Sequence, residues 1–348
     1  MRRRTYQLLW RIVIIVTQLG YFVQANWWEI SSPLVTPSNL YEVCPSVVNN
    51  YTQKRLNICS QPKGILKAMI VGAREAITEC QSHFKTRRWN CTTIRGSGRY
   101  PKAIKIKSRE RAFIQAITSA GLTSAVTRAC ARGEVADCGC DAKARLKPTK
   151  GWEWGGCSDD LVAGEKIGRA LIDRKSSDKR DFDIIVDLHN NEAGRKALKR
   201  QVQLVCKCHG VSGSCTVKVC WRKLQALHRA AKTLMERYEG ATKVKINKKR
   251  KWRVAGEGIR KPTKKDLLYV NDSPDYCEAD ESLELPGTRG RECNRTSVGI
   301  DGCLLLCCGR GYRTIVRMEE EKCNCRFEWC CKVKCEKCIV RRDIYICN

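Results

Sequence analysis

The residues whose types and spacing could do chemistry lie together in CHGVSGSC, residues 208–215. A serine close to a histidine raises the possibility of nucleophilic catalysis. A nucleophile elbow, however, needs the pattern G-x-S-x-G, and Ser214 stands where the second glycine should be. Ser212 and His209 are neighbours in sequence, which does not make a triad, and no acid partner or oxyanion motif accompanies them. The sequence therefore does not favour an enzyme.

A zinc site is the second possibility for this stretch. Its spacings, CKCH and C-x4-C, differ from the C-x2-C pairs that are typical of structural zinc sites. A chain made for an oxidising compartment would also hold its cysteines as disulfides rather than as free thiolates. The sequence therefore argues against zinc, whose ligands would be Cys206, Cys208, His209, Cys215 and Cys220.

A disulfide-closed hairpin is the third possibility. Gly210 and Gly213 would supply turn conformations that other residues avoid, and Ser212 would lie exposed at the tip. Such a serine could serve a modifying enzyme that must reach its hydroxyl, or the serines of a plain tight turn could bond only locally. The residues alone leave both alternatives open. The stem would be closed by the nested pairs Cys206–Cys220 and Cys208–Cys215.

The N-terminus has the pattern of a secretory signal peptide. Arginines at positions 2–4 precede an apolar run, Ile12–Phe22, that is too short to span a bilayer, and Ala25 is a small residue suited to a cleavage site. We therefore expect residues 1–25 to be a signal peptide, with an uncleaved membrane anchor as the alternative. No second segment of the sequence is long enough to cross a membrane.

Charge and cysteine content limit the classes of protein to which this chain can belong. The chain has 348 residues, a formal charge of +30 and 24 cysteines, all of them after residue 25. A secreted chain with so many cysteines should form disulfides. Its charge should attract polyanions, and outside the cell these are sulfated glycans and acidic membrane surfaces rather than nucleic acid.

The cysteines divide the chain into two parts that differ in cysteine density and in apolar spacing. Twelve lie in Cys44–Cys220 and twelve in Cys277–Cys347, a much shorter segment. The second part has few long apolar periods, so disulfides must replace much of its missing core, and we expect short strands and loops there. The first part has apolar residues at helical spacing. It predicts helices over 64–80, 111–130, 182–200 and 222–238, and another with Ser158 as N-cap and Asp159 and Asp160 in its first turn.

These features predict an α+β, disulfide-rich fold of two domains. A helical N-terminal domain, 26–240, would carry the disulfide-closed hairpin, 206–220. A basic linker, 241–270, would lead to a small cysteine-rich β domain, 271–348.

The expected linker is strongly basic. Residues 243–265 hold eleven Lys or Arg and one acid, Glu257. The segment could be only a solvated linker, or it could bind heparan sulfate, since clustered Lys and Arg match rows of sulfates. We favour both together. The predicted glycan-binding residues are Lys248, Lys249, Arg250, Lys251 and Arg253.

One known family has motifs like these in the same order. CKCHGVSGSCTVKVCW, 206–221, closely resembles the signature of the Wnt family of secreted signalling glycoproteins. Further motifs extend the resemblance from about Cys44 to Cys347. They are ECQSHFKTRRWNC (79–91), GWEWGGCSDD (151–160), LHNNEAGRKA (188–197), GTRGRECN (287–294), DGCLLLCCGRGY (301–312) and CNCRFEWCCKVKCEKC (323–338).

The resemblance implies a use for the exposed serine. In Wnt proteins the first serine of this loop carries a monounsaturated fatty acyl group, attached in the endoplasmic reticulum by Porcupine, and this position is Ser212. The acylated loop, or thumb, enters an apolar groove of the Frizzled cysteine-rich domain. The resemblance also implies association with membranes through the acyl chain, and Wntless as a carrier during secretion. It implies no cofactor and no metal.

A second receptor contact is implied in the C-terminal domain. The family's index finger corresponds to RFEWCCKV, with a vicinal disulfide at the turn. Without the resemblance, local core packing would be the preferred interpretation of its aromatic residues. The implied receptor-binding residues are Phe327, Trp329, Cys330, Cys331 and Val333.

The resemblance also implies the pairing of the remaining cysteines. Cys44 and Cys59 are left to pair with each other, and Cys330 with Cys331. The other implied bridges, besides the two of the hairpin, are Cys80–Cys91, Cys130–Cys138, Cys140–Cys157, Cys277–Cys308, Cys293–Cys303, Cys307–Cys347, Cys323–Cys338 and Cys325–Cys335.

Four sequons could carry N-glycans. Asn90 and Asn294 recur in Wnt motifs and are favoured over Asn50 and Asn271. Together these features predict a secreted, lipidated glycoprotein of the extracellular space and matrix that activates Frizzled, with lipoprotein-receptor-related co-receptors as further partners. The alternative is a matrix or heparan-sulfate-binding structural protein without a receptor-activating lipid.

Overall fold

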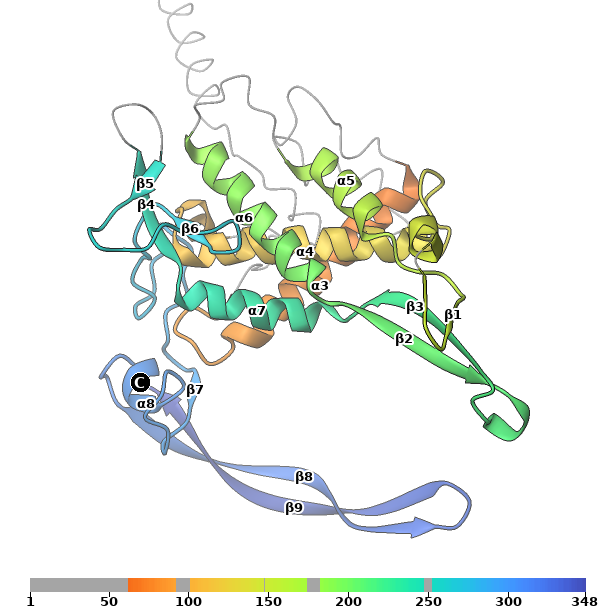
Figure 1. Cartoon of the computed structure of the whole chain (residues 1–348). Helices are drawn as coiled ribbons and strands as arrows, with labels where there is room; N and C mark the ends of the chain where they lie inside the picture. The colour runs from red at the N-terminus through yellow and green to blue at the C-terminus, as the bar shows by residue number, and fades with distance from the viewer. Residues whose placement is uncertain (1–61, 92–100, 147, 174–181, 247–251) are drawn as a thin grey trace, which may run out of the picture.

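The computed structural model describes residues 62–91, 101–146, 148–173, 182–246 and 252–348. Several sequence predictions lie outside these residues. They are the signal peptide 1–25, the pair Cys44–Cys59, the sequon at Asn50 and the glycan-binding residues Lys248, Lys249, Arg250 and Lys251. Within the described residues, the chain forms helices packed together, with two long hairpins that extend from them (Figure 1).

The helical part is built around α4, Arg109–Ala131. Its N-cap is Ser108, whose hydroxyl accepts a hydrogen bond from the Arg111 amide, and nearly every residue along it is buried. Small and β-branched side chains on all its faces let neighbouring helices approach closely. It contacts α3 (Lys63–Phe84), α5 (Leu161–Ile172), α6 (Phe182–Lys199) and α7 (Leu227–Glu239).

The four helical segments predicted from apolar spacing are present, but two helix starts differ. The predicted N-cap Ser158 accepts a hydrogen bond from the Arg222 amide instead, and Asp160 caps α5 by accepting one from Ala163. The predicted helix over 222–238 begins only at Leu227, because the preceding residues complete a strand. The sequence correctly indicated a capping side chain in this stretch. The contact with Arg222 engages Ser158, and Asp160 serves as the N-cap.

Glycines allow the backbones of α4 and α6 to touch. A Cβ at Gly194 of α6 would lie 1.9 Å from the carbonyl oxygen of Ala116 in α4. Neither atom belongs to a flexible side chain, so the helices would have to separate. The crossing therefore depends on glycine for space.

We expect Gly194→Ala to lower the free energy of unfolding by about 1–3 kcal/mol, the usual cost of overpacking. Gly168→Ala in α5 is the matched control, because its new Cβ would meet only the Thr123 hydroxyl, at 3.1 Å. Denaturant titration of both variants measures the difference. Equal unfolding midpoints for the two variants would show that the α4–α6 crossing can accommodate an extra methyl group without loss of stability.

The hairpin predicted at 206–220 belongs to a three-stranded sheet. β2 (Val202–His209) pairs antiparallel with β3 (Val217–Leu224), and β1 (Glu153–Trp154) pairs parallel with β3. The base of the hairpin is anchored where the Asp159 carboxylate accepts a hydrogen bond of 2.6 Å from the Leu224 amide.

The expected linker is a folded segment rather than a plain connection. β4 (Thr242–Ile246) pairs with β5 (Trp252–Val254) and with β6 (Leu268–Tyr269). Val244 and Leu268 are buried against Val186 of α6. Apolar residues between the basic ones therefore tie this sheet to the helical part.

The C-terminal part differs from the short strands that we expected. β8 (Tyr312–Glu328) and β9 (Lys332–Cys347) form one long antiparallel hairpin, and β7 (Glu292–Cys293) adds a third strand at its base. Beside that base lies the short helix α8, Cys303–Leu306. A small core of half-cystines and one leucine forms here, from Cys303, Leu306, Cys307 and Cys347.

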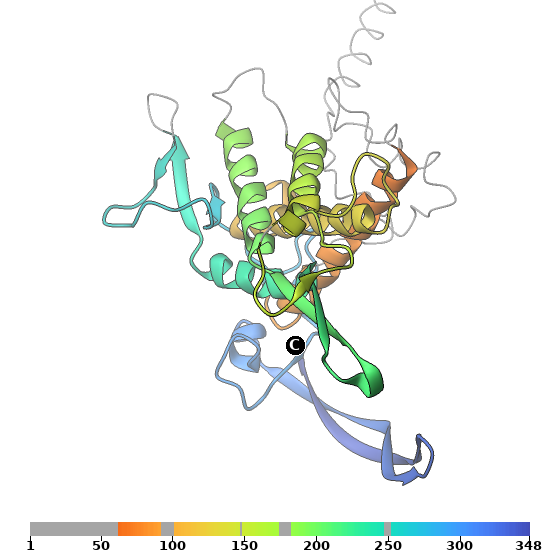
Figure 2. The same ribbon diagram turned by 45° about the vertical axis from the view of Figure 1, so that its right-hand side comes forward.

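Arginine side chains join the two parts. Arg291 donates to the carbonyl oxygen of Lys85 at 2.9 Å, and Arg88 donates to that of Leu305 at 3.0 Å. In Figures 1 and 2 the β2–β3 and β8–β9 hairpins extend toward the same side of the molecule. Among the described residues, no helix is both long and apolar enough to cross a membrane.

Candidate binding surface at two hairpin tips

The first tip is held by the two nested disulfides predicted from the sequence. Cys206 and Cys220 face each other in the strand register with Cα atoms 4.0 Å apart, and they are bridged. Nearer the tip, Cys208–Cys215 closes the loop with a Cα separation of 4.5 Å. The four sulfurs are thus disulfides and not thiolates, which removes the ligands that a zinc site would need.

Ser212 lies at the end of this loop, exposed to solvent. It sits in a short 3-10 turn, η5 (Val211–Gly213), and takes the left-handed conformation itself, with φ of 56°. Among the described residues, its hydroxyl has no hydrogen-bond partner, and neither does the imidazole of His209. The loop presents a free hydroxyl rather than a serine bonded to a base.

The role predicted for Gly210 needs correction. Its φ is 180°, which is extended backbone open to any residue, so it does not supply a special turn conformation. It is needed for space, because a Cβ there would lie 2.3 Å from the Ser214 hydroxyl and 2.4 Å from the Ser214 carbonyl oxygen. The strained conformation falls on Ser212 instead.

Val211 is a residue of this tip that the sequence interpretation missed. Its side chain is 87% exposed beside Ser212. The signal was an apolar residue within a loop of glycines and serines, where no core can cover it. Val211 thus places an exposed apolar side chain next to the Ser212 hydroxyl.

The second tip is the turn between β8 and β9. Phe327 and Val333 face each other in the register, and both are exposed. Trp329 follows in the turn with 94% of its surface exposed. The predicted finger residues are therefore together at one tip, and they are not the local core that the alternative interpretation expected.

The vicinal disulfide predicted at this tip is absent. Cys330 and Cys331 are exposed, free thiols, and their φ angles are 75° and 78°. A bridge between neighbours requires both side chains to turn toward the same side of their shared peptide. Both residues lie in the turn between the two strands, in the left-handed conformation, and they are not bridged there.

Two disulfides stiffen the finger behind its tip. Cys323–Cys338 and Cys325–Cys335 join β8 to β9, with Cα separations of 5.9 Å and 4.0 Å. Between them the strand register shifts, because Asn324 adopts a φ of 48°. The shift accommodates the unequal spacing of the paired cysteines, which are two positions apart in β8 and three apart in β9.

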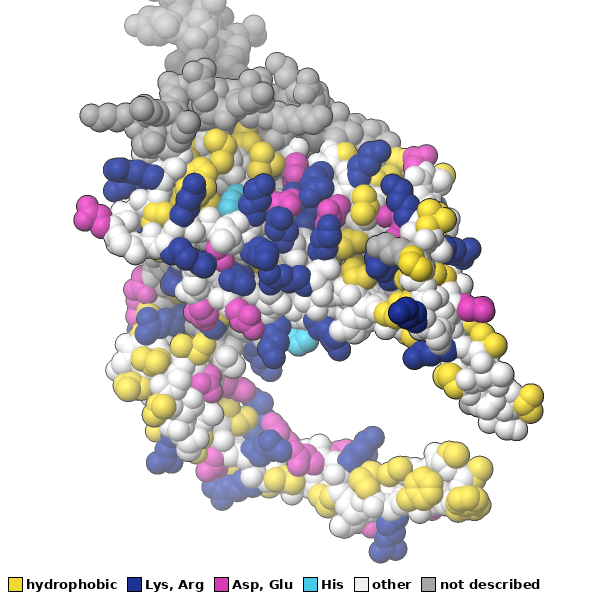
Figure 3. Space-filling view, viewed as in Figure 1, with side chains coloured by type: hydrophobic (Ala, Val, Ile, Leu, Met, Phe, Trp, Pro, Cys, Tyr) yellow, Lys and Arg dark blue, Asp and Glu magenta, His cyan; other side chains and the backbone are white. Residues whose placement is uncertain are grey.

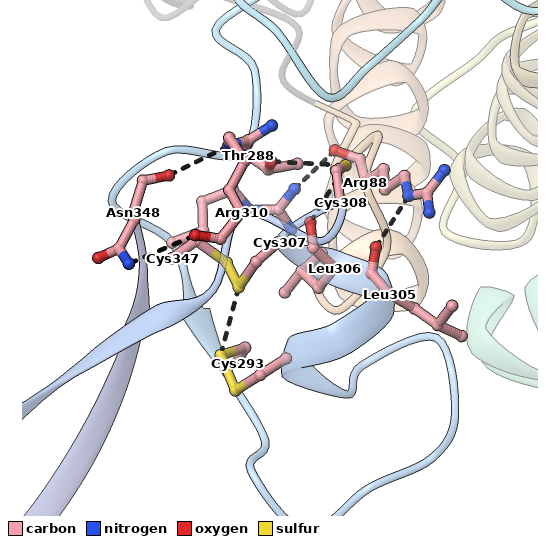
Figure 4. Close-up of a disulfide and its surroundings, with 12 residues drawn as sticks. Arg88, Thr288, Cys293, Leu305, Leu306, Cys307, Cys308, Arg310, Cys347 and Asn348 are labelled. Atoms are coloured by element: carbon pink, nitrogen blue, oxygen red, sulfur yellow. Dashed lines mark hydrogen bonds between the residues drawn. A yellow bond between two sulfur atoms is a disulfide. The ribbon is translucent and has the colours of Figure 1, made fainter.

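The base of the finger is held by further disulfides (Figure 4). Cys307–Cys347 ties the last residues of β9 to α8, with Cα atoms 5.0 Å apart. Arg310 beside it donates a hydrogen bond of 3.1 Å to the carbonyl oxygen of Asn348. The five remaining predicted bridges within the described residues are also formed: Cys80–Cys91, Cys130–Cys138, Cys140–Cys157, Cys277–Cys308 and Cys293–Cys303.

Apolar side chains gather at both tips, with an open gap between them, as Figure 3 shows. Ion pairs follow the finger behind its tip, among them Lys337 with Glu320 at 2.6 Å and Arg342 with Glu319 at 3.3 Å. Apolar tips on charged stems are suited to entering apolar grooves of a partner.

The other predicted sites lie apart from the tips. Asn271 and Asn294 are exposed, and Asn294 accepts a hydrogen bond of 2.9 Å from the Thr296 hydroxyl of its own sequon. Asn90 is partly buried. Arg253, the one predicted glycan-binding residue that the structure describes, is exposed on β5.

A family model described as the Wnt family matches residues 47–348. The chain belongs to the Wnt family. It is thus related to Wnt signalling proteins over nearly all of its length, including both tips. This agrees with the motifs recognised in the sequence.

The chain is similar to two solved Wnt structures. A chain in the structure of human WLS in complex with WNT8A superposes with a TM-score of 0.59 at 31% identity, over 83% of this chain and 96% of that one. The N-terminal domain and linker of Drosophila WntD has a TM-score of 0.44 and 20% identity, over 61% of this chain and 98% of that one.

Proposed function

We propose that this Wnt protein is a secreted ligand that binds and activates Frizzled receptors through its two hairpin tips. The observation that carries the proposal is the exposed, unbonded Ser212 at the end of a doubly bridged hairpin. The apolar finger tip, on the same side of the molecule, supports a two-point grip on one receptor domain (Figure 2).

In this proposal Ser212 carries a monounsaturated fatty acyl group, added by Porcupine. Burial of an acyl chain contributes about 0.8 kcal/mol per CH₂, so a long chain would dominate the contact with an apolar receptor groove. The rigid stem would lower the ordering cost of binding. A related chain is bound to WLS in its solved structure, and we propose Wntless as the carrier of this chain too.

The modification itself is tested by mass spectrometry of the secreted protein. After reduction and alkylation, trypsin should release residues 208–218, which contain Ser212. A mass increment of an unsaturated acyl group on Ser212 is the expected result. An unmodified peptide from protein that still signals would refute the lipid contact.

Trp329 provides an independent test of the finger. We expect Trp329→Ala to weaken binding to the Frizzled cysteine-rich domain by about 30-fold, equivalent to the roughly 2 kcal/mol of an interface hot spot. Its side chain is 94% exposed, so stability should not change. Titration by biolayer interferometry measures the affinity.

Val298→Ala is the control for Trp329→Ala. Val298 is 97% exposed on a loop outside both tips, so its removal should leave affinity unchanged. If both variants bound like the unmodified sequence, the finger would have no part in receptor recognition.

Retention on heparan sulfate is a second proposed property, favoured by the formal charge of +30. Extracellular matrix would then hold the ligand near its source, and N-glycans at Asn90 and Asn294 would aid its passage through the endoplasmic reticulum. Family membership leads us to propose lipoprotein-receptor-related co-receptors as further partners.

A further inference from the structure

A cluster of metal-binding side chains lies outside both tips, between α3 and α7. Glu79 and His83 are one helical turn apart in the last part of α3, and His228 lies in the first turn of α7. The possible ligand atoms of these three residues all lie within 4.8 Å of one another. Folding brings His228 here from 149 positions beyond Glu79.

The separations fit a small cation bound between the side chains. The Nδ1 atom of His228 is 3.0 Å from the Oε2 atom of Glu79, and the Nε2 atom of His83 is 3.9 Å from the same oxygen. In a tetrahedral zinc site with bonds of about 2.0–2.2 Å, ligand atoms are roughly 3.3 Å apart. The observed distances bracket this value.

His83 lacks any other use for its inner nitrogen. Its Nε2 atom is buried and has no hydrogen-bond partner among the described residues. Buried polar atoms are normally satisfied, so an orphaned imidazole nitrogen that faces a carboxylate needs an explanation. A metal ion between them would supply the missing partner.

The surroundings of His83 disfavour its protonation. Burial lowers the pKa of His83, and so do His228 and Arg87 nearby, while Glu79 acts in the opposite direction. Arg87 is itself paired with Glu239.

One rearrangement is required. The two imidazole rings are stacked, with centroids 5.3 Å apart and planes inclined by 15°. Lone pairs lie in the ring planes, so one ring must turn before both nitrogens can meet the same ion. The side chain of His228 is 59% exposed and has room to do so.

We propose that Glu79, His83 and His228 form a binding site for Zn²⁺, with a water molecule as the fourth ligand. Three protein ligands with one open position are a common zinc arrangement. The ion would cross-link α3 to α7, two helices that pack on α4. The site contains neither Ser212 nor any residue of the finger, so zinc binding can be tested independently of receptor binding.

The test is calorimetric titration of the secreted, full-length protein with ZnCl₂. We expect one Zn²⁺ per chain, and at least tenfold weaker binding for His228→Gln. His228 is largely exposed, so its replacement should leave the fold intact. His209→Gln is the matched control, because it removes another exposed imidazole outside the cluster and should leave the affinity unchanged.

The free thiols Cys330 and Cys331 could also take up zinc, and Co²⁺ distinguishes the two sites. Thiolate ligands give Co²⁺ intense charge-transfer absorption, whereas imidazole and carboxylate ligands do not. Absorption without that band, lost in His228→Gln, would support the proposal. A thiolate band alone, or equal zinc affinity in His228→Gln and the unsubstituted protein, would overturn it.

Discussion

Replacing Ser212 with alanine is expected to abolish signalling through Frizzled. The substitution removes the only atom of this position that can carry an acyl ester. Loss of a long buried acyl chain would cost many CH₂ groups at about 0.8 kcal/mol each, so affinity should fall by at least a thousandfold. The secreted variant should still fold, since the hairpin keeps both disulfides. A receptor-reporter assay together with binding to the Frizzled cysteine-rich domain measures the loss.

Ser214→Ala is the matched control for this result. Ser214 lies two residues away in the same loop, where its hydroxyl is 3.1 Å from that of Thr216. Its removal should leave acylation and signalling intact. Full activity of Ser212→Ala, or equal losses in the two variants, would show that the specific hydroxyl at the tip is not the receptor anchor.

The largest effect on stability is expected from Arg195→Met. Arg195 in α6 is only 2% exposed, and it donates to both carboxylate oxygens of Asp173 at 3.1 Å and 2.8 Å. It also donates to the Ser119 hydroxyl of α4 at 3.2 Å. Removing one partner of a buried ion pair typically costs about 3–5 kcal/mol. We expect a loss of that size in denaturant unfolding, together with poor secretion.

Arg169→Met provides the comparison. Arg169 pairs with Glu192 at 2.9 Å, and Arg195 contacts the same carboxylate, but the Arg169 side chain is 43% exposed. An exposed pair contributes less than about 1 kcal/mol, so this variant should be nearly as stable as the unsubstituted protein. A similar small loss for Arg195→Met would mean that water reaches Asp173 once the arginine is gone.

The helical half could be predicted well because its apolar spacing is regular. Leu66, Met69 and Ile117 are apolar residues of the predicted segments 64–80 and 111–130, and all three are fully buried. Ser212 at a hairpin tip followed from the bracketing cysteines and glycines. These features are local in sequence, so local patterns reveal them.

The remainder depended on contacts between distant segments. The length of the finger was missed because β8 and β9 show no alternation of buried and exposed side chains. The burial of Arg195 was missed because its partners Asp173 and Ser119 are 22 and 76 positions away. No local pattern shows that the charge of an arginine will be neutralised inside the protein.

The finger has a consequence for how this protein can diverge. No residue of β8 is buried, and in β9 only Cys347 at its base is. Substitutions on exposed surface usually change stability by less than about 0.5 kcal/mol. Substitutions near Trp329 should therefore be tolerated by the fold, and under the proposed function they could change receptor preference while the helical core stays unchanged. If the finger recognises the receptor as proposed, recognition and folding depend on separate sets of residues.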